Sequence, residues 1–117
     1  MLRDSSGYSR IYIAQGYTDL RQGIDRLAKK VKGQFNLDPF QTNVLFLFCG
    51  RKSDRIKGLL WEGDGFVLLY KRLEDGKFQW PRDEEEAREL TEEQLRWLLT
   101  GHTIERSIHM VEPKRLF

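Results

Sequence analysis

The stretch Val44 to Pro81, VLFLFCGRKSDRIKGLLWEGDGFVLLYKRLEDGKFQWP, decides the fold of this 117-residue chain. Its apolar runs have the length of strands, and short turns separate them. Val44–Cys49 is too short for a typical helix and ends at Gly50, so we expect a buried strand. Arg55–Trp61 and Phe66–Leu73 follow as two further strands. The pattern predicts an antiparallel meander.

The turns of this meander carry residues that suit tight hairpins. Asp64-Gly65 and Asp75-Gly76 tolerate the positive φ that such turns require. Phe66–Leu73 is almost continuously apolar, which favours burial on both faces or a central position in the sheet. We expect Lys77–Trp80 to be a possible fourth strand, ended by Pro81.

Before the meander, the chain predicts one short strand and one long helix. Arg10–Ala14 has the composition of a strand. Thr18 is placed to cap a helix that runs to about Lys32, and Gly33 is a natural C-cap. Apolar residues at helical spacing would form the buried stripe of this helix: Leu20, Ile24, Leu27, Ala28 and Val31. The other face is rich in cations and is a second place where phosphates could bind.

After the meander, the pattern changes to helix. Residues 84–90 could be helical but lack an apolar face. Thr91 and Gln94 match a capping box, and Leu95, Leu98 and Leu99 would give the buried side of a short helix that ends at Gly101. The fold class that we predict is α+β: an antiparallel meander of three to five strands, with one long N-terminal helix packed on it and a short C-terminal helix.

Length and composition indicate one domain over residues 1–117. Within it we expect a loose N-terminus at 1–9, an acidic connector at 82–90 and a C-terminal tail at 102–117. The single cysteine, Cys49, lies in an apolar run and cannot form an internal disulfide, which fits a reducing cytoplasm. No stretch has the length needed to cross a membrane, and the N-terminus has no apolar signal core. We therefore expect a cytoplasmic protein.

Charge is distributed unevenly along the chain. The formal net charge is +2, but residues 82–93 hold two cations and seven anions, a local charge of −5. The remainder therefore carries +7. A basic body with one acidic segment is compatible with a polyanionic partner. The alternative, which the composition favours, is a solvated acidic linker that leads into a helix.

Cations border the predicted strands close to aromatic side chains, a combination that holds phosphates and stacks bases. The alternative is that the aromatic residues fill the core while the cations solvate the rim of the sheet. On the first interpretation, the candidate nucleic-acid-binding residues are Arg51, Lys52, Arg55, Lys57, Trp61, Lys71 and Arg72.

Catalytic and metal sites find little support in the sequence. Asp54, Glu62 and Asp64 could form a carboxylate cluster for a divalent ion, as in a metal-dependent nuclease, but each occupies a turn where such residues are expected for backbone reasons. His102 and His109 lack the short paired spacing of a zinc site. We predict no catalytic residues, no metal site and no cofactor.

Several segments together resemble a known family, the accessory protein TnpB, from the second open reading frame of the insertion sequence 66 family of bacterial transposable elements. The matching segments occur in the order of that family and cover most of the chain from about Ile11 to Gly101. They are GYTDLR at 16–21 with Gly23 and Asp25, LDP at 37–39, FLFCGRKSDRIKGLLWEGDGF at 46–66, YKRLE at 70–74, FQWP at 78–81, and Leu95 to Gly101.

The resemblance implies a non-catalytic accessory protein of DNA transposition, encoded beside a separate, larger transposase. One hypothesis is that it binds DNA at the element ends through the basic face of the meander. The alternative hypothesis is a protein adaptor that docks on the transposase or on the other accessory protein of the same element, through the acidic segment or an exposed sheet edge. A small nuclease that uses Asp54 and Asp64 is a third, weaker hypothesis.

Overall fold

A computed structural model describes residues 7–82 and 87–101 of the chain. Our expectations for residues 1–6, for the acidic residues 83–86 and for the tail at 102–117 lie outside these ranges. The elements in chain order are β1 (Arg10–Ala14), α1 (Ile24–Lys29), the π-helical turn η1 (Lys30–Gln34), β2 (Val44–Cys49), β3 (Arg55–Trp61), β4 (Phe66–Arg72), β5 (Ala87–Leu90) and α2 (Glu92–Leu99).

The five strands form one mixed sheet in the order β4-β3-β2-β1-β5. The pairs β2–β3, β3–β4 and β1–β5 are antiparallel, whereas β1 pairs with β2 in parallel. Our prediction of a purely antiparallel meander is therefore wrong at this pair. The physical reason is that β1 and β2 are joined by a long connection containing α1, and such a crossover returns the chain to run in the same direction.

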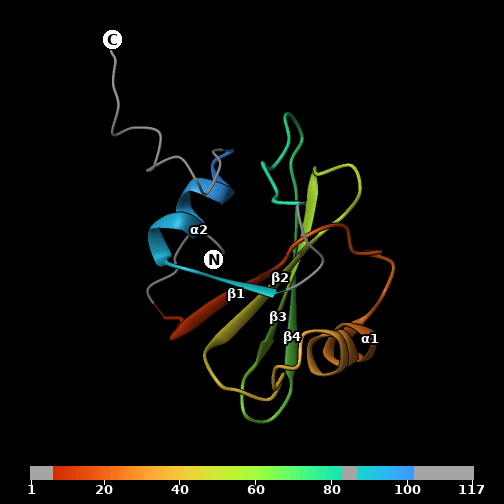
Figure 1. Ribbon diagram of the computed structural model, residues 1–117, viewed down its shortest axis with the longest axis vertical. Coiled ribbons are helices and arrows are strands. Elements are labelled where there is room, and N and C mark those ends of the chain that lie inside the picture. The colour runs from red at the N-terminus through yellow and green to blue at the C-terminus, as the bar shows by residue number, and fades with distance from the viewer. Residues whose placement is uncertain (1–6, 83–86, 102–117) are drawn as a thin grey trace.

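β2 lies at the centre of the sheet and organises both cores. All six of its residues are buried, as the sequence predicted. Val44, Phe46 and Phe48 pack with Leu27 of α1 on one face. The alternate residues Leu45, Leu47 and Cys49 pack on the other face with the leucines of α2. Figure 1 shows the two helices on opposite sides of the sheet, so the molecule has three layers.

β4 is the outer strand beside β3 within the described sheet. Its apolar run had indicated a central position, but its residues are at most half-buried because one edge has no neighbouring strand. The expected strand at Lys77–Trp80 is also absent. That segment is held by single contacts instead: the Phe78 amide donates to the Ser53 carbonyl at 2.7 Å, and Trp80 Nε1 donates to the Ala14 carbonyl at 2.8 Å.

The first helix is shorter than we predicted and begins later. Thr18 does not cap it, because the Thr18 amide donates to the Cys49 carbonyl at 2.9 Å and so belongs to the sheet end. Asp19 then forms a tight turn, and the helix begins after Gly23. Its last turn is π-helical, with the Phe35 amide donating to the Lys30 carbonyl at 3.2 Å. Gly33 therefore lies inside this turn and is not the C-cap.

The C-terminal elements were predicted in part. Ala87–Leu90 is strand β5 and not helix, because it covers the free edge of β1 with Leu90 opposite Ile11. The capping box at Thr91 is confirmed: Thr91 Oγ1 accepts from the Gln94 amide at 3.1 Å, and Gln94 Oε1 accepts from the Thr91 amide at 2.9 Å.

Candidate functional site

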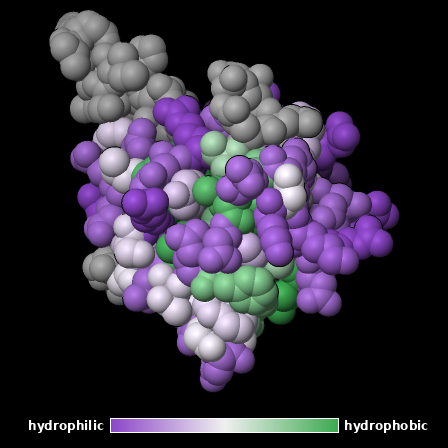
Figure 2. Space-filling model, turned by 60° about the horizontal axis from the view of Figure 1, so that its bottom comes forward, coloured by the Kyte–Doolittle hydropathy of each residue, from purple (hydrophilic) through white to green (hydrophobic). Residues whose placement is uncertain are grey.

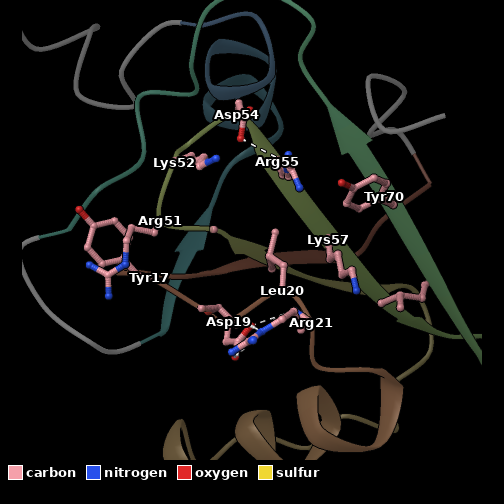
Figure 3. A pocket seen from close by; sticks show the side chains of 13 residues that line it. Tyr17, Asp19, Leu20, Arg21, Arg51, Lys52, Asp54, Arg55, Lys57 and Tyr70 are labelled. Carbon is pink, nitrogen blue, oxygen red and sulfur yellow. Dashed lines mark hydrogen bonds and ion pairs between the residues drawn. The ribbon is translucent and has the colours of Figure 1, made fainter.

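A hollow of about 990 Å³ opens between the loop that follows β1 and the surface of β3 and β4 (Figure 3). Three separate parts of the chain line it. They are the loop Tyr17–Arg21, the turn and first half of β3 from Gly50 to Lys57, and two residues of β4, Leu68 and Tyr70. Leu20 and Leu68 supply the apolar part of the wall, and most of the other side chains are charged or aromatic.

The loop side of the hollow is stiffened by an ion pair between neighbours. Arg21 Nη2 lies 2.9 Å from Asp19 Oδ2, and the Arg21 Nε and backbone amide both donate to Asp19 Oδ1 at 3.0 Å. These hydrogen bonds from Arg21 hold the pKa of Asp19 at about 2, well below its usual range. Asp19 is therefore ionised at every physiological pH and partly neutralises Arg21.

Tyr17 forms one end of the hollow and contacts two guanidinium groups. Cζ of Arg82 lies 3.6 Å from the centroid of the Tyr17 ring, and Cζ of Arg51 lies 4.8 Å from it. Arg82 Nη2 also donates to the Gly50 carbonyl at 3.3 Å and to the Ser53 hydroxyl. Arg82 thus fixes both the ring and the turn that carries Arg51.

Tyr70 forms another side of the hollow and leaves its ring accessible. The side chain is 53% exposed, and Lys57 Nζ lies 6.0 Å from the ring centroid. Lys57 and Tyr70 are direct partners in the antiparallel β3–β4 pair, so they share one face of the sheet. Lys57 Nζ also donates to the Gln22 carbonyl at 3.3 Å, which connects this face to the loop.

The charge around the hollow is clearly positive. Two carboxylates, Asp19 and Asp54, oppose five cations: Arg21, Arg51, Lys52, Arg55 and Lys57. The carboxylates lie beside particular cations, because Asp54 Oδ1 is 3.5 Å from Arg55 Nε and Asp19 pairs with Arg21. Within the described part of the chain, Arg51 and Lys52 form no ion pair. Their charges are therefore the ones most available to an anionic ligand.

Thr18 lines the hollow and carries a buried hydroxyl. The residue is only 3% exposed, and Oγ1 has no hydrogen-bond partner among residues 7–82 and 87–101. Such a group normally finds a partner, because leaving it unsatisfied costs about 1–3 kcal/mol.

The structure brings four of the seven predicted binding residues together. Arg51, Lys52, Arg55 and Lys57 line the hollow (Figure 3). Arg72 is paired directly with Arg55 across β3 and β4 and shares its face, although its Nε lies 3.1 Å from Glu74 Oε2.

The other two predicted residues, Lys71 and Trp61, lie elsewhere. Lys71 is paired with Ile56, whose side chain belongs to the core under α2, so Lys71 is on the opposite face of the sheet. Trp61 ends β3 and packs at 5.0 Å from Phe40 and 4.9 Å from Phe66, measured between ring centroids. Trp61 is therefore part of a separate aromatic cluster with Phe40 and Phe66. Figure 2 brings the bottom of Figure 1 forward and shows hydrophobic areas among hydrophilic residues on that face.

Sequence reasoning missed Tyr17 and Arg82, whereas Arg21 belongs to the cationic face of the predicted first helix, the second place where phosphates could bind. Tyr17 precedes the predicted N-cap Thr18 and no pattern gave it a role, and Arg21 was expected on a helix but lies in a loop. Arg82 follows Pro81 and lies far from Tyr17 in the sequence, so no local pattern connects them. The available signal for the loop was Gly16, a residue that breaks the preceding strand, and the structure gives it a positive φ of 82°.

The carboxylates considered for metal binding are not grouped. Asp54 precedes β3, whereas Glu62 and Asp64 follow it, so the strand separates them. Among the residues that the structure describes, no three His, Cys, Asp or Glu side chains are placed to hold a metal ion.

Cys49 is fully buried, and burial raises the pKa of its thiol to about 11, although Arg82 acts to lower it.

Comparison with protein families identifies the family of this chain. Residues 9–109 match the family described as IS66 Orf2 like protein. The chain belongs to this family. The resemblance noted from its sequence segments is confirmed, and this IS66 Orf2-like protein is thereby a transposition-associated accessory protein.

Two curated proteins are similar to this IS66 Orf2-like chain. It is 40% identical over 92 residues to uncharacterized protein y4hO of Sinorhizobium fredii, an alignment that covers 79% of each chain. It is 32% identical over 92 residues to uncharacterized protein y4jC of the same organism, covering 79% of this chain and 78% of the relative. No solved structure matches significantly. Neither described helix is long and apolar enough to cross a membrane.

Proposed function

We propose that this IS66 Orf2-like protein binds DNA during transposition through the basic hollow. One observation carries the proposal: five cations from two distant segments converge on one concave surface that also presents aromatic rings. Cations gathered in this way neutralise phosphates and release the counterions condensed on DNA. Arg51, Lys52, Arg55 and Lys57 are the proposed phosphate contacts, and Arg72 extends the same face.

The arrangement favours nucleic acid over a small anion. The hollow is open, and its cations are spread from Arg21 on the loop to Arg55 and Lys57 on β3. A small anion would need its donors to converge on one point, whereas a phosphate backbone presents charges in a row. Membership of a transposition-associated family makes DNA the relevant polymer.

A salt titration of DNA binding tests this proposal, with duplex DNA carrying the terminal repeat of the element beside a scrambled duplex. Lys57→Gln and Lys71→Gln form a matched pair of variants. Lys57 faces the hollow, whereas Lys71 lies on the opposite face of the adjacent strand. We expect Lys57→Gln to weaken binding and to reduce the salt slope by about 1, and Lys71→Gln to bind like the native protein.

Two results would overturn the proposal. The first is an affinity that does not change between low and high salt. The second is an equal effect of the two lysine substitutions, which would mean that the hollow has no special part. Thermal unfolding of each variant distinguishes a loss of binding from a loss of folding.

The second candidate is an adaptor that docks on the transposase or on the other accessory protein of the element. The observation that favours it is the outer edge of β4, where Phe66–Arg72 has no neighbouring strand within the described sheet. Such an edge can accept a strand from another protein. Co-purification that survives nuclease treatment, and that weakens when Glu84, Glu85 and Glu86 are neutralised, would support this role in place of DNA binding.

A further inference from the structure

The geometry points to unpaired, single-stranded DNA as the ligand of the hollow, with a base stacked on Tyr70 and phosphates held by Arg51, Lys52 and Lys57. This inference rests on the proposed DNA-binding function and specifies which form of DNA the site takes. Four observations carry it: the exposed ring of Tyr70, the ring of Tyr17 that guanidinium groups already contact, the apolar wall, and the concave shape of the hollow.

The ring of Tyr70 is placed as a stacking surface. It is 53% exposed on the sheet face that lines the hollow, and the Lys57 ammonium lies over the ring at 6.0 Å from its centroid, at the distance limit of such a contact. In a duplex the faces of the bases are already covered by their neighbours, so an exposed ring gains nothing from them. An unpaired base can stack on the ring, and this contact is tolerant of sequence because every base has a π-face.

Tyr17 has a different role in the hollow, because guanidinium groups already contact its ring. Arg82 lies 3.6 Å and Arg51 lies 4.8 Å from the ring centroid. This contact holds the Arg51 guanidinium near one place at the rim, where Lys52 follows it in the chain. In Figure 3, Tyr17 with Arg51 and Tyr70 with Lys57 lie on different sides of the hollow, with Leu20 between them. The two sides thus suit the backbone and the base of one strand.

The wall between the two tyrosines also suits a single strand. Leu20 and Leu68 make it apolar, and Thr18, whose buried hydroxyl has no partner among the described residues, also lines the hollow. An apolar surface matches the face of an unpaired base, which a duplex keeps covered by the neighbouring bases. A hollow of about 990 Å³ admits a nucleotide with room for its neighbours.

The inference is tested by anisotropy with a labelled single strand of about 12 nucleotides and a duplex of the same sequence, at one salt concentration. We expect the native protein to bind the single strand more tightly. Tyr70→Ala should weaken single-strand binding by about 5- to 100-fold, the loss expected for one stacked base, and leave duplex binding unchanged. Tyr70→Phe keeps the ring and should bind like the native protein.

Phe40→Ala is the matched control, because Phe40 is also 53% exposed but lies in the aromatic cluster with Trp61. It should leave both affinities unchanged. A strand with 2-aminopurine as one base adds a direct readout: its emission should fall on binding to the native protein and to Tyr70→Phe, and should not fall with Tyr70→Ala. Thermal unfolding confirms that each variant is folded.

The outcomes separate this inference from the proposed function. Equal or tighter binding of the duplex, or an equal loss for both ligands with Tyr70→Ala, overturns the inference while DNA binding stands. No binding of either ligand overturns both. Tighter binding of RNA of the same sequence would overturn the assignment to DNA.

Discussion

The Arg82 guanidinium joins three parts of the chain at the residue scale. It stacks on Tyr17 after β1, and it donates to the Gly50 carbonyl and the Ser53 hydroxyl in the turn before β3. A partly buried cation–π contact of this kind is worth about 1–2 kcal/mol. Side-chain contacts of Arg82 therefore hold this end of the hollow in place, although its backbone consists of loops and turns.

Cys49 provides a prediction at the same scale. Burial raises the pKa of its thiol to about 11, so the thiol keeps its proton at neutral pH. Because the folded state holds this proton more tightly than the unfolded state, the stabilisation is fully present below the ordinary value of 9.0 and is lost as the pH rises through about 11. We expect iodoacetamide to label the native protein very slowly at about pH 8 and the denatured protein rapidly.

Mass spectrometry over time measures this labelling, with glutathione in the same tube as an exposed thiol. Equal rates for native and denatured protein would show that the core around Cys49 opens easily. The buried cysteine itself was predictable, since VLFLFC has no polar residue. Its neighbour Arg82 was not, since the two are brought together only by the folded chain.

Local pattern decides some elements and tertiary pairing decides others. β2, β3 and the extent of β4 followed from short apolar runs with glycine at their ends, and the Thr91 capping box followed from residue types alone. β5 did not, because Ala87–Leu90 has little apolar character and becomes a strand by pairing with the edge of β1. The start of α1 was missed because Leu20 fits the helical spacing of the apolar residues. The turn at Asp19 keeps Leu20 outside the helix.

The capping box allows a prediction at the element scale. Thr91→Ala removes the acceptor for the Gln94 amide, which would then lack its partner at the start of α2. We expect a loss of about 1 kcal/mol in the free energy of unfolding, measured by urea denaturation. Thr91→Ser keeps a hydroxyl and should lose much less. An equal loss in both variants would show that the threonine methyl, and not the cap, matters.

The whole molecule is nearly balanced in charge, yet the hollow is locally basic. Four of its cations come from the GRKSDRIK segment, where the sequence indicated them, and this part of the candidate site was predictable. The fifth, Arg21, comes from the loop and is paired with Asp19. The sequence indicated Arg21 as part of a cationic helix face, but its position in a loop beside the hollow could not be predicted, because that position depends on the parallel pairing of β1 with β2.

Asp19 therefore controls the effective charge of the site. Because the pKa of Asp19 is about 2, it offsets Arg21 at any working pH. Asp19→Asn should release Arg21 and strengthen DNA binding, with a salt slope that is steeper by up to about 1. Asp25→Asn makes the same change of charge on α1 and should have a smaller effect. Salt titrations of both variants would contradict the prediction if their slopes changed equally.

The place of β1 between β2 and β5 has a consequence for how the protein is made. A ribosome releases the N-terminal part first, at about 5–20 residues per second, so β1, α1 and β2 can assemble early. The second edge of β1 waits until Ala87–Leu90 has emerged, after most of the described chain. During that interval β1 is an edge strand of the nascent protein, and its open edge is able to pair with another chain. Chaperone contact is therefore most useful to this protein late in its synthesis, just before the sheet closes.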